Sequence, residues 1–62
     1  MVVEVYYFIL GVYAERRAVH YDDPHKANEI FEATIRKMQK NKNDCLICLR
    51  KDNDELIKSF RT

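Results

Sequence analysis

Hydrophobic positions recur with a 3.6-residue period in only one long segment of the chain, between Asp23 and Asn41. At 100° per residue, its apolar side chains fall within an arc of about 140°. Asp23 can accept hydrogen bonds from the first turn, and Pro24 suits the first helical position because its missing N–H would be unpaired there. We expect Asn41 or Asn43 to take the left-handed conformation after the last turn. The pattern predicts an amphipathic helix with a buried face of Ala27, Ile30, Phe31, Thr34, Ile35 and Met38.

Four shorter segments are rich in β-branched, aromatic and other apolar residues, which favours strands. They cover residues 2–10, 17–21, 45–50 and 55–60. The first and third are apolar on both faces, as is typical of strands in the centre of a sheet. The first reversal lies between Gly11 and Arg16, and the charges of Arg16 and Arg17 suit an edge strand.

The order strand, strand, helix, strand, strand predicts an α+β fold (ββαββ) in a single small domain, residues 1–62. If the two doubly apolar strands are neighbours, the connection through the helix must skip the first strand. The expected architecture is a four-stranded antiparallel sheet in the order 2-1-3-4, with the helix on one face. The pattern does not decide which face the helix covers.

One helix covers only one face of such a sheet, so apolar side chains of the central strands remain on the other. A chain of 62 residues buries only about 60% of its unfolded surface, so a second layer of protein packed on the uncovered face would add stability. We therefore expect a non-catalytic protein-binding or regulatory module that forms a homodimer or binds another protein through the uncovered face. The candidate interface residues are Tyr6, Phe8, Leu10, Leu46 and Cys48.

The charge of the chain argues against nucleic acid as the main partner. The formal net charge is only +1, which provides little attraction to nucleic acid or to anionic lipid. The alternative function is a nucleic-acid-associated regulator that uses a basic rim near the helix C-terminus. That rim consists of Arg36, Lys37, Lys40 and Lys42.

Two groups of residues have the composition of a chemical site but not its geometry. Cys45 and Cys48 have the spacing of a redox or zinc motif, yet residues three apart in a strand point to opposite faces. We interpret both as small buried hydrophobic residues. The group His20, Asp22, Asp23 and His25 is better explained by a strand end, a helix cap and a first helical turn.

No nucleotide-binding or nucleophile motif occurs, so we expect no enzyme, cofactor, metal or small-molecule substrate. The apolar stretch of residues 1–10 is interrupted by Glu4 and is too short to span a bilayer. It also lacks the basic leader of a signal peptide. Together with the two cysteines, this predicts a reducing, cytoplasmic location without a membrane anchor.

Overall fold

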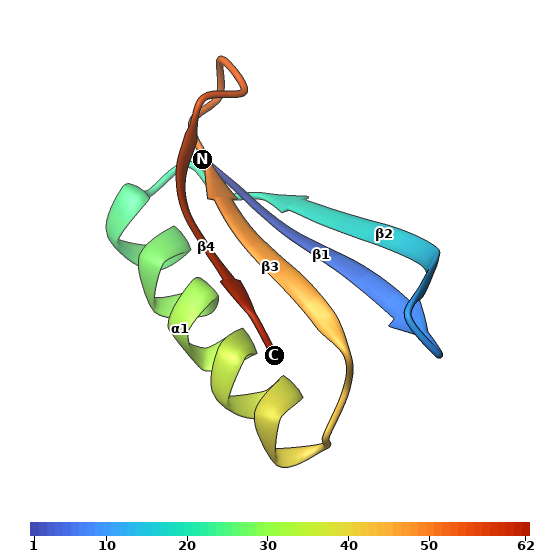
Figure 1. Ribbon diagram of the computed structural model, residues 1–62. Helices are drawn as coiled ribbons and strands as arrows, with labels where there is room; N and C mark the ends of the chain where they lie inside the picture. Colours follow the sequence, from blue (N-terminus) through green and yellow to red (C-terminus); the bar gives the residue numbers. More distant parts are fainter.

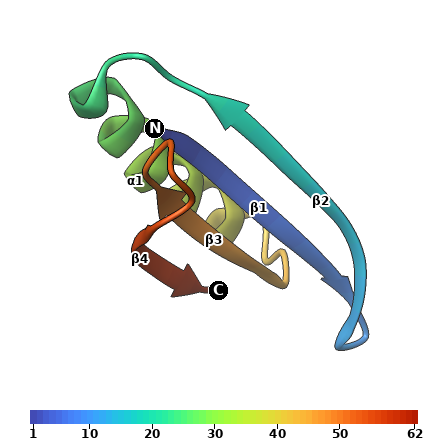
Figure 2. The ribbon, with the colours of Figure 1, turned by 90° about the horizontal axis from the view of Figure 1, so that it is seen from above.

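The computed structural model describes all residues from Met1 to Thr62 and has the predicted ββαββ order (Figure 1). The sheet is antiparallel, with the strands in the order β2-β1-β3-β4, as predicted (Figure 2). The two doubly apolar strands therefore lie in the centre, where both of their faces can be covered. The elements are β1 (Val2–Ile9), β2 (Val12–His20), α1 (Pro24–Lys40), β3 (Cys45–Arg50) and β4 (Leu56–Arg61).

Helix α1 begins where its sequence predicts and ends slightly differently. The Asp23 carboxylate accepts a hydrogen bond from the His25 N–H at 2.9 Å, and Pro24 is the first helical residue. At the other end, Lys42 has a φ of 56°, so the left-handed residue is neither Asn41 nor Asn43. The Lys42 N–H donates to the Gln39 carbonyl and the Asn43 N–H to the Met38 carbonyl. This Schellman pattern requires its left-handed residue at the position that lysine occupies.

The first hairpin turns earlier than the sequence indicated. Its two-residue turn consists of Leu10 and Gly11, with φ angles of 52° and 79°, so β2 begins at Val12 rather than Arg17. Two positive φ angles in a two-residue turn are the geometry of a type I′ hairpin. Asparagine or aspartate usually precedes the glycine of such a turn. Because leucine stands there in this chain, the sequence did not show a recognisable type I′ turn.

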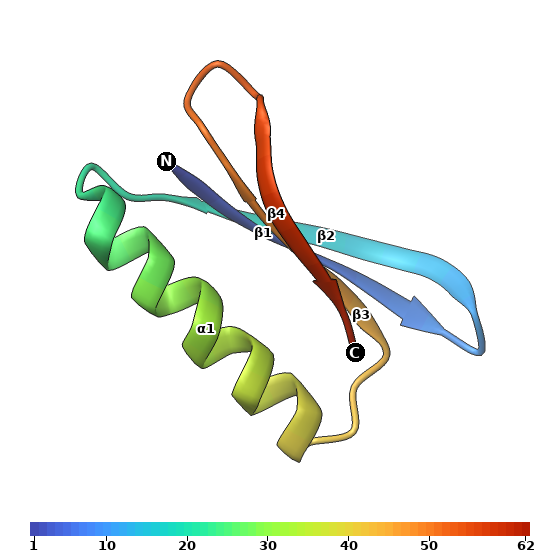
Figure 3. The same cartoon turned by 60° about the vertical axis from the view of Figure 1, so that its left-hand side comes forward.

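Helix α1 packs on one face of the sheet, mainly over β1 and β3 (Figure 3). The odd-numbered residues of both central strands point to the helix. The helix therefore covers the face that carries these residues, a choice that the sequence pattern did not decide. Phe31 fills the middle of the core at 3% exposure. The buried cluster consists of Val3, Val5, Ala27, Phe31, Met38, Cys45, Ile47 and Leu49.

The hairpin of β1 and β2 extends beyond the rest of the sheet (Figures 1 and 3). Strand β3 pairs with β1 only from Val2 to Tyr7. No helix of the chain combines the length and the apolar character needed to cross a membrane.

Candidate functional site

The face of the sheet opposite α1 holds most of the predicted interface residues, and we call it the open face. Because Val5 and Ile47 point to the helix, the alternation of the strands places their neighbours on the other side. Tyr6 pairs with Leu46 in the register, and Phe8 continues the same side of β1. Leu10 is separate from this group because it lies in the turn, at 98% exposure. The open-face members of the predicted set are Tyr6, Phe8, Leu46 and Cys48.

A buried carboxylate occupies the centre of the open face. Glu4 is only 2% exposed, and its two oxygens are shared between three side chains. Arg16 of β2 donates from Nε at 2.8 Å and also from Nη2, while Arg50 of β3 donates from its Nε to the other oxygen. The Tyr6 hydroxyl donates at 3.1 Å. The centre of this face is therefore a satisfied polar network rather than a bare apolar surface.

The network controls the ionisation of two groups. Burial raises the pKa of the Glu4 carboxyl, but the hydrogen bonds from Arg16, Arg50 and Tyr6 outweigh it, so the pKa is lowered. Burial, together with the nearby Glu4 charge, raises the pKa of the Cys48 thiol. Because the thiolate is the nucleophilic form of cysteine, Cys48 lacks the properties of a reactive thiol.

Aromatic side chains gather at the hairpin end of the open face. The Tyr13 ring centroid lies 6.4 Å from that of Tyr6 and 6.4 Å from that of Phe8. The Arg61 guanidinium lies 4.0 Å from the centre of the Phe8 ring and is held by the Asp44 carboxylate at 2.8 Å. Such stacking favours a fixed orientation of the ring. We call Tyr6, Phe8, Tyr13 and Leu46 the aromatic patch.

Beyond the aromatic patch lies an exposed apolar hairpin tip, which consists of Ile9, Leu10 and Val12; Ile9 and Val12 point to the opposite face from Phe8 and Tyr13. Ile9 is 66% exposed and Val12 is 68% exposed, and the two are cross-strand partners. No other element of the chain pairs with this part of the hairpin. An apolar surface that the chain itself does not cover is typical of an interaction site.

The predicted interface set left out Val12 and Tyr13 because the sequence interpretation placed the turn too late, and it left out Ile9 because it used the other face of the first strand. With the reversal at Leu10 and Gly11, Phe8 and Tyr13 become partners on one face, and Ile9 and Val12 on the other. The available signal was the only glycine of the chain. The sequence interpretation also missed the pairing of Glu4 with Arg16 and Arg50, because that pairing depends on the strand order and register.

The predicted basic rim lies on the second half of α1 and at Lys42, two residues beyond the end of the helix. Arg36, Lys37, Lys40 and Lys42 are all exposed. None of them has a carboxylate within 4.0 Å, whereas Lys58 pairs with Glu32 at 3.1 Å. The rim is therefore a group of cations without neutralising partners in the chain.

The structure separates the residues that resemble a metal or redox site. Cys45 is buried on the helix side and Cys48 on the open face, so the two free thiols diverge as expected. His20 lies 3.1 Å from Asp52, whereas His25 lies 3.2 Å from Glu29. No three side chains of the types that bind metals converge on one point.

Comparison with known proteins does not assign a role to any of these surfaces. The chain matches no protein-family model, no curated protein and no solved structure. The open face, the hairpin tip and the basic rim must therefore be interpreted from their own geometry.

Proposed function

We propose that the chain is a small non-catalytic protein-binding module that forms a homodimer through its aromatic patch and hairpin tip. The observation that carries this proposal is the exposure of the hairpin tip and of the adjacent Tyr13, in the part of the hairpin that extends beyond β3. Four apolar residues in close succession there have no cover from the chain itself: Ile9 at 66%, Leu10 at 98%, Val12 at 68% and Tyr13 at 57% exposure.

The residue types next to the tip support a protein partner. Tyrosine, phenylalanine and arginine are enriched at interface centres, where they carry much of the binding energy. Here Arg61 stacks on Phe8 at 4.0 Å from the ring centre, and Arg16 lies 5.9 Å from the centre of the Tyr6 ring. A surface that is already ordered loses less side-chain entropy on association. A two-fold axis would match the patch with itself in an identical chain.

Pairing through the sheet edges is a poorer alternative. Strand β2 forms one edge and carries Arg16 and Arg17, while β4 forms the other and carries Lys58 and Arg61. Charged side chains along an edge oppose the addition of an identical strand. The proposed dimer therefore uses the hairpin tip and the aromatic patch.

Sedimentation equilibrium on the purified chain is expected to reveal a dimer at micromolar concentration. Leu10→Asn combined with Val12→Thr should raise the dimer dissociation constant by about tenfold or more, equivalent to roughly 1.4 kcal/mol. Asparagine tolerates the left-handed conformation of position 10, where φ is 52°, so the hairpin should still form.

Leu56→Asn is the matched control because Leu56 is a 47% exposed leucine of β4, distant from the tip. It should leave the dissociation constant within about twofold. A native chain that stays monomeric at 100 micromolar, about 100-fold above a micromolar dissociation constant, would contradict the homodimer. A dimer disrupted only by the control would contradict the assigned surface.

A second candidate function is nucleic-acid association through the basic rim. The observation in its favour is that none of the four cations has a carboxylate partner. The formal net charge of only +1 argues against this function, because it provides little attraction to nucleic acid. If the rim binds RNA or DNA, the affinity should fall steeply with salt, and Lys37→Gln with Lys40→Gln should reduce that slope. A slope that does not change in the double variant would exclude the rim as the contact surface.

A further inference from the structure

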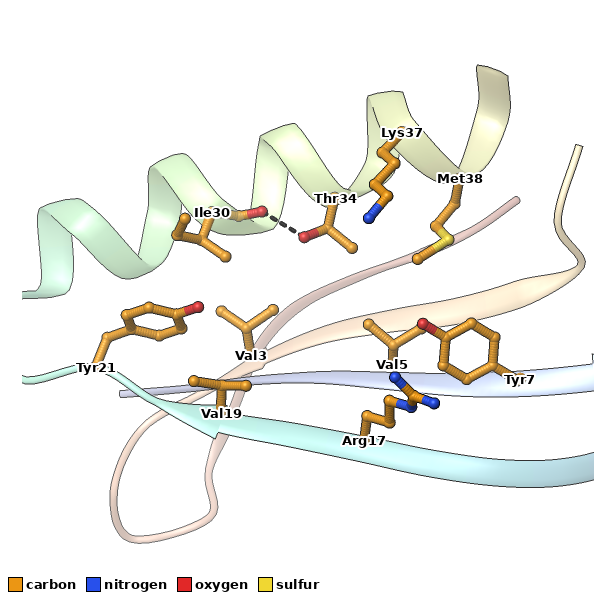
Figure 4. A pocket seen from close by; sticks show the side chains of 10 residues that line it. All are labelled: Val3, Val5, Tyr7, Arg17, Val19, Tyr21, Ile30, Thr34, Lys37 and Met38. Atoms are coloured by element: carbon orange, nitrogen blue, oxygen red, sulfur yellow. Dashed lines mark hydrogen bonds between the residues drawn. The ribbon is translucent and has the colours of Figure 1, made fainter. Parts of the chain in front are cut away.

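A pocket lies on the other side of the sheet, between α1 and the first hairpin (Figure 4). It exists because α1 packs over β1 and β3 and leaves β2 uncovered, with all nine of its residues exposed. The cavity has a volume of about 190 Å³. Strand β1 forms its floor, while β2 and α1 form its two walls (Figure 4).

Most of the pocket is apolar. Its aliphatic lining comes from Val3, Val5, Val19, Ile30 and Met38. The Thr34 hydroxyl, which also lines it, already donates to the Ile30 carbonyl at 2.7 Å. The greater part of the cavity therefore suits a hydrocarbon group, which gains free energy by leaving water.

Two cations reach this apolar space from opposite walls. Lys37 comes from α1 and points toward the sheet, while the Arg17 guanidinium comes from β2 and lies beside Val5, close to the Tyr7 side chain (Figure 4). Lys37 has no carboxylate within 4.0 Å. Arg17 has only an exposed contact with Glu15 at 3.6 Å, and its guanidinium lies 5.9 Å from the Tyr7 ring centre. Neither positive charge is strongly neutralised within the chain.

From this arrangement we infer that the pocket binds a small amphipathic carboxylate. The carboxylate lies between Arg17 and Lys37, where it accepts charge-assisted hydrogen bonds. The apolar tail lies along Val5 and Val19 towards Ile30. At about 190 Å³ the pocket is smaller than the roughly 300–1,000 Å³ of pockets that hold drug-sized ligands, which favours a ligand with a short hydrocarbon chain.

This site shares no residue with the proposed dimer surface. It lies on the α1 side of the sheet, whereas the aromatic patch lies on the open face, and the hairpin tip lies beyond Tyr7, outside the pocket lining. The sequence did not indicate it, because Arg17 and Lys37 belong to different elements and line one pocket only when α1 packs over β1 and β3 and leaves β2 uncovered. It would make the chain a small-molecule binder in addition to a protein-binding module.

Titration calorimetry with octanoate, octanol and octylamine tests the inference, with octanoate and octylamine below their micelle-forming concentrations and octanol below its solubility limit. Octanoate should bind about tenfold or more tightly than octanol, and octylamine should bind least. In Lys37→Gln, octanoate should bind several-fold more weakly while octanol is unchanged. Lys40→Gln is the control because Lys40 is a neighbouring exposed lysine that does not line the pocket.

Amide chemical shifts should locate the octanoate site at Val19 and Thr34. The hairpin-tip variant, Leu10→Asn with Val12→Thr, should bind octanoate like the native chain, which separates this site from the dimer. Absence of octanoate binding at millimolar concentration would overturn the inference. Equal binding of the three probes, or shifts confined to the open face, would also overturn it.

Discussion

Replacing Phe31 by alanine is expected to lower the free energy of unfolding by about 3–5 kcal/mol, the range for removing a buried aromatic ring. Phe31 is 3% exposed in the middle of the only core, and the Lys58 ammonium lies 5.0 Å from its ring centre. At about 0.05–0.15 kcal/mol per residue, the whole domain has a stability of only about 3–9 kcal/mol. Urea unfolding at a fixed protein concentration measures the change.

Two further variants keep this test informative even if the alanine variant does not fold. Phe31→Leu retains most of the apolar volume and should lose about 1.5 kcal/mol or less. Lys26→Ala replaces an exposed residue of the same helix and should change the free energy of unfolding by no more than about 0.5 kcal/mol. A loss below about 1 kcal/mol in Phe31→Ala would mean that α1 does not pack on the sheet through this ring.

The sheet order was predictable because hydrophobic patterning depends on how many faces of an element are covered. Strands β1 and β3 are apolar on both sides, which only central positions satisfy. The helix start was predictable for a local reason, since Asp23 and Pro24 provide the cap and the first position by themselves. Both inferences depend on neighbouring residues or on simple alternation.

Two of the remaining features depend on contacts between distant residues, and one depends on an unusual local conformation. Glu4 interrupts an apolar strand, and only the registers of β2 and β3 bring Arg16 and Arg50 to its carboxylate. The early turn depends on a leucine in a conformation that leucine rarely takes. The cavity between α1 and β2 depends on the lateral position of the helix, which periodicity does not specify.

The Glu4 network is expected to make stability depend on pH. The folded-state pKa of Glu4 is lowered from its ordinary value of 4.5. A carboxyl with a depressed folded-state pKa contributes its stabilisation fully above the unfolded-state value and loses it as the pH falls through the folded-state value. The free energy of unfolding should therefore decrease as the pH is lowered below 4.5. Urea unfolding across this range measures the profile.

Glu4→Gln tests whether this carboxylate is responsible. Glutamine keeps the shape of the side chain but removes the charge, so near neutral pH the variant should be about 1–3 kcal/mol less stable. Because protonation removes the same charge from the native protein, the difference between the two should shrink as the pH falls. Glu32→Gln is the control because it removes only the exposed ion pair with Lys58, at 3.1 Å, and should cost about 1 kcal/mol or less. If Glu4→Gln retains native stability and the same acid profile, the arginines do not stabilise the fold through Glu4. The open face would then be held together by its aromatic patch and strand pairing alone.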